Sequence, residues 1–254
     1  MDPSAYRQLA EKEEDHFWFR GRRAIFFPVL DRLIGARNDL RVCEIGCGAG
    51  GLLKRLTKYG PVLGIELDRD FAALALDRTE LPILSGDACR LPLPDECMDL
   101  VCLFDTLEHI PDEHGALSEI LRVLVPGGIA FFSVPAYQFL WSNNDRVAHH
   151  QRRYTKSGLA AAFDRAGLET LRLSYFNSFL FPLILPAVLL TKLKERIIGL
   201  RNEGHTNLSV RIPHVVNEVL ARIMGSEGRI LPRVSMPIGH SLLGAARKPP
   251  RAED

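Results

Sequence analysis

The chain has 254 residues, of which 46% are hydrophobic and 25% are charged, and its formal net charge is +1. This size suits one globular domain with additions, and the lack of a basic excess argues against nucleic acid as the main partner. The five cysteines form no C-x-x-C pair, so the sequence predicts no metal site and favours a reducing cytoplasm. The N-terminus does not read as a signal peptide.

The apolar pattern divides the chain into alternating elements. The expected strands are continuous apolar runs, which is typical of a parallel sheet covered on both faces. Strands that alternate with helices predict a doubly wound α/β fold. The chain begins with an expected helix over 4–34. Five expected strands follow, over 40–45, 62–67, 83–85, 98–104 and 128–134, with helices between them over 51–58, 70–77 and 113–124. After these we expect a loop over 136–154, a helix over 155–166, a strand over 168–175, a helical stretch over 177–235 and a strand over 240–246.

The most informative segment is a glycine-rich turn after the first expected strand. Gly46, Gly48 and Gly51 fit the G-x-G-x-x-G pattern of nicotinamide dinucleotide sites, and Gly50 completes an E-x-G-x-G-x-G pattern that begins at Glu44. Glycines let the turn bend and let a ligand approach the backbone, and the following helix offers unpaired N–H groups. The glycines alone therefore fit either nicotinamide or S-adenosylmethionine.

Acidic residues at three strand ends favour S-adenosylmethionine. Glu44 suits a cationic ligand and would repel a pyrophosphate. Glu66 ends the second expected strand, where a carboxylate can accept hydrogen bonds from two ribose hydroxyls. Asp87 follows the third strand, where it can accept a hydrogen bond from the amino group of adenine.

Five segments in this order carry a family resemblance: CEIGCGAGG, GIELD, GDACRLPLPD, LFDTLEHIPD and LRVLVPGG. Over residues 40–135 the chain resembles the class I S-adenosylmethionine-dependent methyltransferases of the small-molecule type, which are similar to methyltransferase type 11. The resemblance implies a Rossmann-like, seven-stranded sheet with an antiparallel last strand. It also implies three parts: an N-terminal helical lid (1–39), a core (40–176 with 236–248) and a helical insertion (177–235).

The resemblance also assigns residues to the cofactor. The glycine turn would hold the methionyl and ribose side, Glu66 the ribose hydroxyls, and the later strand ends the adenine and the sulfonium pocket. The implied cofactor residues are Glu44, Gly46, Cys47, Gly48, Gly50, Glu66, Leu67, Asp87, Ala88 and Phe104.

The acceptor side is expected in the 136–154 loop, because ligands of a parallel sheet bind at the carboxyl ends of its strands. If the acceptor is a hydroxyl, a base should take its proton. His150 is the first candidate, His109 the second, and Tyr154 lies in the same loop. We expect Trp18, Asp145, Arg152 and Arg153 to bind the acceptor. Structural roles remain open: a loop hydrogen bond for His150, a helix-start bond for His109, a solvated surface for the arginines and packing for Trp18.

Two end segments are similar to a narrower group of these proteins. These segments are Glu14–Arg20 and the loop from Trp141 to Tyr154. Many members of that group are associated with envelope-polysaccharide functions. That is an associational hint of a saccharide acceptor.

The apolar stretch Phe179–Leu190 is too short to span a bilayer. Basic residues follow it: Lys192, Lys194, Arg196 and Arg201. The insertion fits a membrane surface, a cap over the site or a homodimer interface.

The expected function is methyl transfer from S-adenosylmethionine to a small-molecule acceptor, either lipid-linked or saccharide. The expected location is the cytoplasm, with a peripheral position at the inner membrane face as an extension. The alternatives are a non-catalytic cofactor-binding protein of the same fold and an NAD-dependent oxidoreductase.

Overall fold

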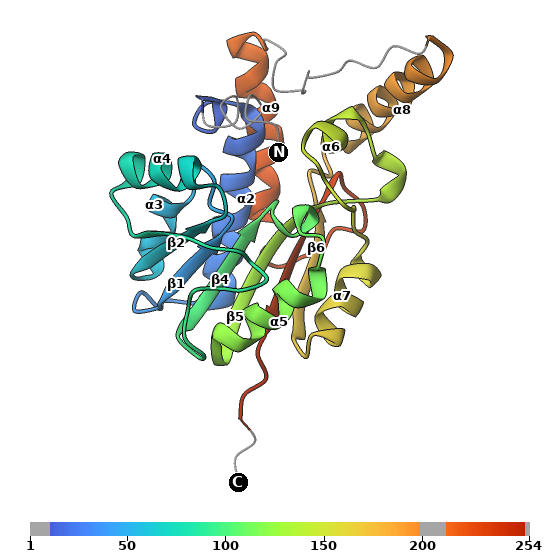
Figure 1. Cartoon of the computed structure of the whole chain (residues 1–254). Helices are drawn as coiled ribbons and strands as arrows, with labels where there is room; N and C mark the ends of the chain where they lie inside the picture. Colours follow the sequence, from blue (N-terminus) through green and yellow to red (C-terminus); the bar gives the residue numbers. More distant parts are fainter. Residues whose placement is uncertain (1–10, 199–211, 252–254) are drawn as a thin grey trace. The chain divides into compact units, whose positions relative to one another are not determined.

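The computed structural model describes residues 11–198 and 212–251 (Figure 1). The chain divides into two compact units. The first unit comprises the described parts of Met1–Leu33, Pro135–Tyr154 and Ser174–Leu242, and the second those of Ile34–Val134, Thr155–Leu173 and Leu243–Asp254. The expected division into lid, core and insertion stays a prediction.

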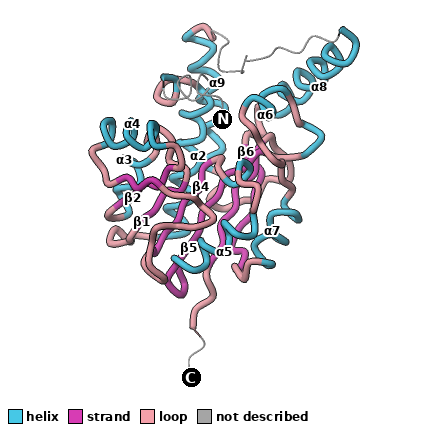
Figure 2. Tube along the Cα trace, in the orientation of Figure 1, coloured by secondary structure: helices cyan, strands magenta, loops and turns pink. Residues whose placement is uncertain are grey.

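A seven-stranded sheet, drawn in magenta in Figure 2, forms the centre of the second unit. Its strands are β1 (Val42–Ile45), β2 (Val62–Glu66), β3 (Ile83–Ser85), β4 (Met98–Phe104), β5 (Leu124–Pro135), β6 (Glu169–Phe176) and β7 (Ser241–Arg247). Their order is β3-β2-β1-β4-β5-β7-β6. A few end residues of β5, β6 and β7 belong to the first unit. Strands β1 to β5 pair in parallel, and β7 runs antiparallel to β5 and β6. The predicted doubly wound α/β fold and its antiparallel last strand are confirmed.

Helices and 3-10 turns connect these strands in the second unit. They are α3 (Leu53–Leu56), the 3-10 turn η1 (Thr57–Tyr59), α4 (Arg69–Thr79), the 3-10 turn η2 (Leu107–His109), α5 (Glu113–Val123) and α7 (Lys156–Arg165). Three of the helices, α4, α5 and α7, have side-chain caps. The carboxylates of Asp68 and Asp112 accept backbone N–H groups at the starts of α4 and α5. Thr155 caps α7 as predicted, and Gly167, with φ +79°, follows its end.

Strand β5 begins earlier than the sequence predicted. The segment around Gly127 and Gly128 looked like a turn before a strand over 128–134. In the structure β5 already starts at Leu124, where it pairs with Met98. Two backbone hydrogen bonds tie this segment to Lys248: the Gly127 N–H donates to the Lys248 carbonyl, and the Lys248 N–H donates to the Gly128 carbonyl. Gly127 has φ +79°, so the strand continues through an irregularity that glycine permits.

The first unit is mainly helical. It contains α2 (Phe17–Ile34), η3 (Gln138–Leu140), α6 (Asn143–Val147), α8 (Phe181–Ile198), α9 (His214–Ser226) and η5 (Glu227–Arg229). The expected continuous helix over 4–34 is wrong in its described part, because residues 13–16 form turns and α2 starts at Phe17. The Asn217 side chain on α9 accepts the Phe17 N–H at 2.8 Å, which satisfies the first donor of α2. Residues 4–10 lie outside the described residues.

Within the two described ranges, no helix combines the length and hydropathy that crossing a bilayer requires. The segment 136–154, expected as a loop, contains the short helices η3 and α6.

Candidate functional site

The turn after β1 is built around three glycines with positive φ angles. They are Gly46 (φ +70°), Gly48 (φ +55°) and Gly50 (φ +87°), a region that side chains disfavour. A Cβ at Gly46 would lie 2.4 Å from the Thr106 methyl group, whereas one at Gly48 would meet nothing within 4 Å. The turn therefore packs tightly at its first glycine and leaves open space at its second, where a ligand can approach the backbone.

Glu66, at the carboxyl end of β2, is held against this turn. Its Oε2 accepts the Gly48 N–H at 2.8 Å, and its Oε1 accepts the Asp68 N–H at 3.0 Å. The residue is buried. A carboxylate has about four acceptor positions, so these two bonds fix its orientation and leave capacity for two hydroxyl groups. The next residue, Leu67, is 70% exposed, which places an apolar surface beside the oriented carboxylate.

Glu44 brings a second buried carboxylate to the same strand ends. It lies at the end of β1 and is buried. Burial raises the pKa of the neighbouring Cys47 thiol, and the carboxylates of Glu44 and Glu66 raise it further. Cys47 is therefore a small apolar wall rather than a nucleophile, and the turn carries a negative field that favours a cation.

Asp87 and Ala88 form a tight turn after β3. The Asp87 Oδ1 atom accepts the Cys89 N–H at 2.8 Å, and the Asp87 carbonyl accepts the Arg90 N–H. The Asp87 side chain is exposed. A carboxylate that is held at one oxygen and open to solvent can accept a hydrogen bond from an amino group of a ligand.

Phe104, the last residue of β4, is buried, and its ring centroid lies 5.9 Å from that of Phe131. Asp105 follows it with φ +51°, an unfavourable angle for a residue other than glycine. Its N–H donates to the Ser133 carbonyl at 2.9 Å, and the Ser133 hydroxyl donates to its Oδ1 at 2.8 Å. Asp105 belongs to the segment expected at the sulfonium pocket, but the sequence did not predict its left-handed φ or its contact with Ser133.

In the first unit, the predicted acceptor loop contains a buried network around Asp145. Its carboxylate is fully buried and accepts two hydrogen bonds from Arg153, from Nε at 2.7 Å and from Nη2 at 2.9 Å. The Ser142 N–H donates to it at 2.7 Å. Burial alone would raise the pKa of Asp145, but hydrogen bonds from His150 and Arg153 outweigh burial and hold that pKa well below its usual range.

The same carboxylate orients His150. Nδ1 of His150 lies 2.8 Å from the Asp145 Oδ1 atom. An ionised carboxylate only accepts, so Nδ1 carries the proton and Nε2 is the basic nitrogen of the neutral ring. A histidine held in this tautomer can remove a proton from an acceptor.

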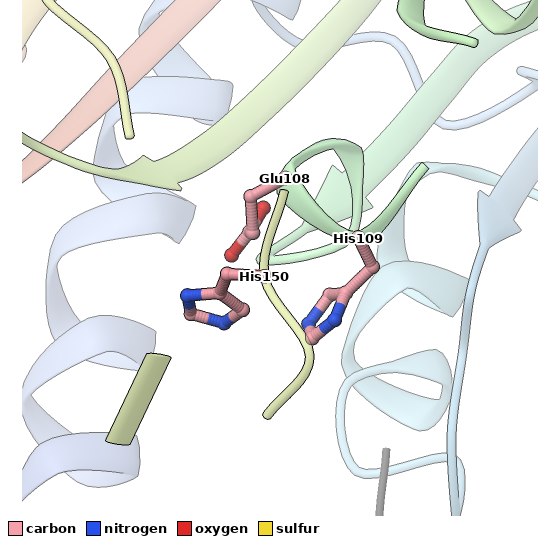
Figure 3. Close-up of side chains that lie close together, drawn as sticks. All are labelled: Glu108, His109 and His150. Atoms are coloured by element: carbon pink, nitrogen blue, oxygen red, sulfur yellow. The ribbon is translucent and has the colours of Figure 1, made fainter. Parts of the chain in front are cut away.

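The other predicted residues come from several elements. Figure 3 shows His109 and Glu108 on the turn after β4, and His150 on its own loop segment. Trp18 packs edge-on against His240 with centroids 5.8 Å apart. Tyr154 is buried, and its backbone forms a parallel β-bridge with that of Ala136. Arg152 is partly exposed in the same loop. Their roles toward an acceptor stay predictions.

Asp145 and Arg153, which we expected to bind the acceptor, are engaged with each other and have almost no exposed surface. Their direct contact with an acceptor also stays a prediction.

Comparison with known proteins identifies the central part of the chain. Residues 43–132 match the model of the family described as a methyltransferase domain. A probable S-adenosylmethionine-dependent methyltransferase of Mycolicibacterium smegmatis is 32% identical over 171 residues, which cover 64% of this chain and 63% of that protein. Residues 43–132 of this chain are thus a methyltransferase domain, similar to that of S-adenosylmethionine-dependent methyltransferases.

The further matches of the methyltransferase domain agree. A sterol 24-C-methyltransferase of Neurospora crassa is 31% identical over 132 residues, which cover 47% of this chain and 34% of that protein. The solved structure of a putative methyltransferase from Bacillus halodurans has a TM-score of 0.60 at 20% identity, covering 87% of this chain and 97% of that one. The structural likeness supports the fold alone. The chain spans less than two thirds of the length of these two curated relatives.

The cofactor of this family is S-adenosylmethionine, and the residues of the glycine turn fit it. The open space at Gly48 leaves room against the backbone. The oriented Glu66 offers acceptor positions for hydroxyl groups, and buried Glu44 supplies negative charge for a cation. The methyltransferase domain thus has the polar groups that a charged nucleoside requires.

Proposed function

We propose that this chain transfers the methyl group of S-adenosylmethionine to a small-molecule acceptor. The observation that carries the proposal is the Glu66 carboxylate, fixed by the Gly48 and Asp68 N–H groups beside an open glycine turn. When bound, S-adenosylmethionine supplies an electrophilic methyl group on a sulfonium.

The chain's own residues would divide the binding. Glu66 accepts the ribose hydroxyls, Leu67 contacts the adenine, and Asp87 with Ala88 recognises its amino group. The turn residues Glu44, Gly46, Cys47, Gly48 and Gly50, together with Phe104, would line the methionyl and sulfonium side.

His150 is the proposed base for a hydroxyl acceptor. The loop that carries it follows directly on β5, a parallel strand of the sheet, and Asp145 fixes its tautomer. Arg153 keeps Asp145 ionised and in place. Asp145 and Arg153 then act as positioning residues, while Arg152, Tyr154, Trp18 and His109 remain candidates for contact with the acceptor.

The proposed acceptor is apolar or joined to an apolar carrier. One relative is named for methylating a sterol, which is an apolar molecule. A lipid-linked acceptor, or a saccharide joined to such a carrier, would suit a peripheral position at the inner membrane face. A homodimer is the alternative use of the helical insertion.

Calorimetry with S-adenosylmethionine and S-adenosylhomocysteine tests the cofactor site. Glu66→Gln removes the charge that strengthens bonds to two hydroxyls. Since such charge-assisted bonds contribute roughly 1.5–3 kcal/mol, we expect Kd to rise about 10- to 100-fold. The control Asp77→Asn, on the exposed surface of α4, should leave Kd unchanged.

Binding of neither ligand by the parent chain would refute the proposal. Binding without transfer of labelled methyl to extract fractions would favour a non-catalytic protein of this fold. Binding of NAD in the same experiment would favour the oxidoreductase.

A further inference from the structure

Helix α8 exposes apolar side chains over about three turns. Leu183 is 68% exposed and Leu190 is 59% exposed, and Leu189 and Leu193 are also exposed. Side chains at positions 183 and 190 lie on one face, because they are two helical turns apart. A helix in water normally buries such residues, so this surface suits an apolar partner.

Helix α9 of the same unit adds an apolar stripe. Val215, Val216, Val219 and Ile223 are exposed at spacings of three, four and seven residues. Its other face is occupied: Asn217 and Glu218 bond to Phe17 and Arg20 of α2. The stripe is therefore the outward face of a packed helix.

A third apolar contribution comes from η3. Phe139 is 54% exposed and stacks on Tyr137 with centroids 5.3 Å apart. The Lys192 ammonium group donates to the Phe139 carbonyl at 2.7 Å, which ties α8 to η3. A cation thus lies at the border of the apolar surface.

The charge of this region differs from that of the rest of the chain. Residues 177–235 contain eight Lys and Arg and four Asp and Glu, which gives a formal charge of +4. The rest of the chain contains 24 Lys and Arg and 27 Asp and Glu, which gives a formal charge of −3. No Asp or Glu occurs from Thr170 to Lys194. An apolar surface bordered by cations is complementary to the head groups and acyl chains of an anionic bilayer.

A second copy of the chain fits the same surface less well. In a two-fold interface each patch meets its own copy, so the cations of one insertion would face those of the other. We propose that α8, the outward face of α9 and Phe139 form a lipid-binding surface that rests on an anionic membrane. Membrane binding is a property additional to the proposed methyl transfer, and it would bring the enzyme to an apolar acceptor in the bilayer.

Vesicle flotation of the full chain tests the proposal. We expect the chain to float with phosphatidylcholine vesicles that contain phosphatidylglycerol and to float less with phosphatidylcholine alone. Because burying each leucine is favourable, the double variant Leu183→Ser with Leu190→Ser should lower the partition coefficient at least about tenfold. Lys192→Gln should lower it about three- to fivefold on the anionic vesicles only.

Matched variants in the second unit control for surface chemistry. Leu76→Ser on α4 removes a leucine that is 50% exposed, and Lys54→Gln on α3 removes an exposed cation. Both should float like the parent. Circular dichroism should show that every variant retains the helical content of the parent.

Three results would overturn the lipid surface. They are no flotation on either vesicle, flotation that the leucine double variant leaves unchanged, and a dimer by light scattering that the double variant dissociates without any flotation. Calorimetry with S-adenosylmethionine in the absence of vesicles reports separately on the proposed function, so either proposal can fail alone.

Discussion

The turn after β1 and the loop after β5 follow two strands of the same sheet but are built by different means. The turn uses backbone: three glycines with positive φ and N–H groups that orient Glu66. The loop uses side chains: one buried carboxylate, Asp145, which holds Arg153 and His150. A backbone site constrains the residue type at each glycine, whereas a side-chain network depends on one central charge.

Removing His150 should have the largest effect on activity. A positioned general base contributes about 10²- to 10⁴-fold, so His150→Ala should lower kcat by that factor and change KM little. The assay is transfer of labelled methyl from S-adenosylmethionine into lipid and aqueous extract fractions.

The control for this variant is His149→Asn, at the exposed neighbour whose φ of +59° asparagine tolerates. Turnover of His150→Ala within a few-fold of the parent would remove His150 from the role of base.

Removing the central charge of the loop should have the largest effect on stability. Asp145→Ala leaves the Arg153 cation buried without its carboxylate, which should cost about 3–5 kcal/mol in the free energy of unfolding. Urea unfolding of both proteins measures the difference.

Glu169→Ala is the matched control, because it breaks the exposed pair with Arg247, for which we expect at most about 1 kcal/mol. Equal losses of unfolding free energy in the two variants would show that the buried Asp145 network stabilises the fold no more than an exposed ion pair does.

A smaller effect is expected from adding one methyl group to the glycine turn. Gly46→Ala combines an unfavourable φ with a Cβ that would overlap Thr106. We expect a loss of about 2–4 kcal/mol in unfolding free energy, together with weaker S-adenosylmethionine binding.

Gly35→Ala separates the two causes. Gly35 has φ +73° but open space around its Cβ position, so only the backbone cost of about 1–2 kcal/mol should appear. Similar losses at both positions would mean that Thr106 moves aside.

The sequence predicted the sheet better than the loop. The strands at 83–85 and 98–104 have the bounds that their apolar runs predicted. Strand β4 is buried over Leu100–Phe104, and burial on both faces demands such a continuous apolar run, whereas β3 is largely exposed. The start of β5 was missed because Leu124 pairs with Met98, and the glycines that follow it bond to Lys248, more than a hundred residues later. Long-range partners leave no local pattern.

The buried state of Asp145 was missed for the same reason. An aspartate in a polar loop looks like a solvent-facing group, and only the folded loop brings Ser142 and Arg153 to it. Asp105 has a left-handed φ and a contact with Ser133, and a residue type that tolerates this region does not by itself predict either.

The position of β7 has a consequence for synthesis on the ribosome. Strands β5 and β6 flank β7 in the sheet but precede it in the chain, so each has an unpaired edge until residues 241–247 emerge. At a synthesis rate of roughly 5–20 residues per second, the 71 residues from the end of β6 to the end of β7 take about 4 to 14 s. During that interval the nascent chain exposes two strand edges that can bind a chaperone or pair with a neighbouring chain.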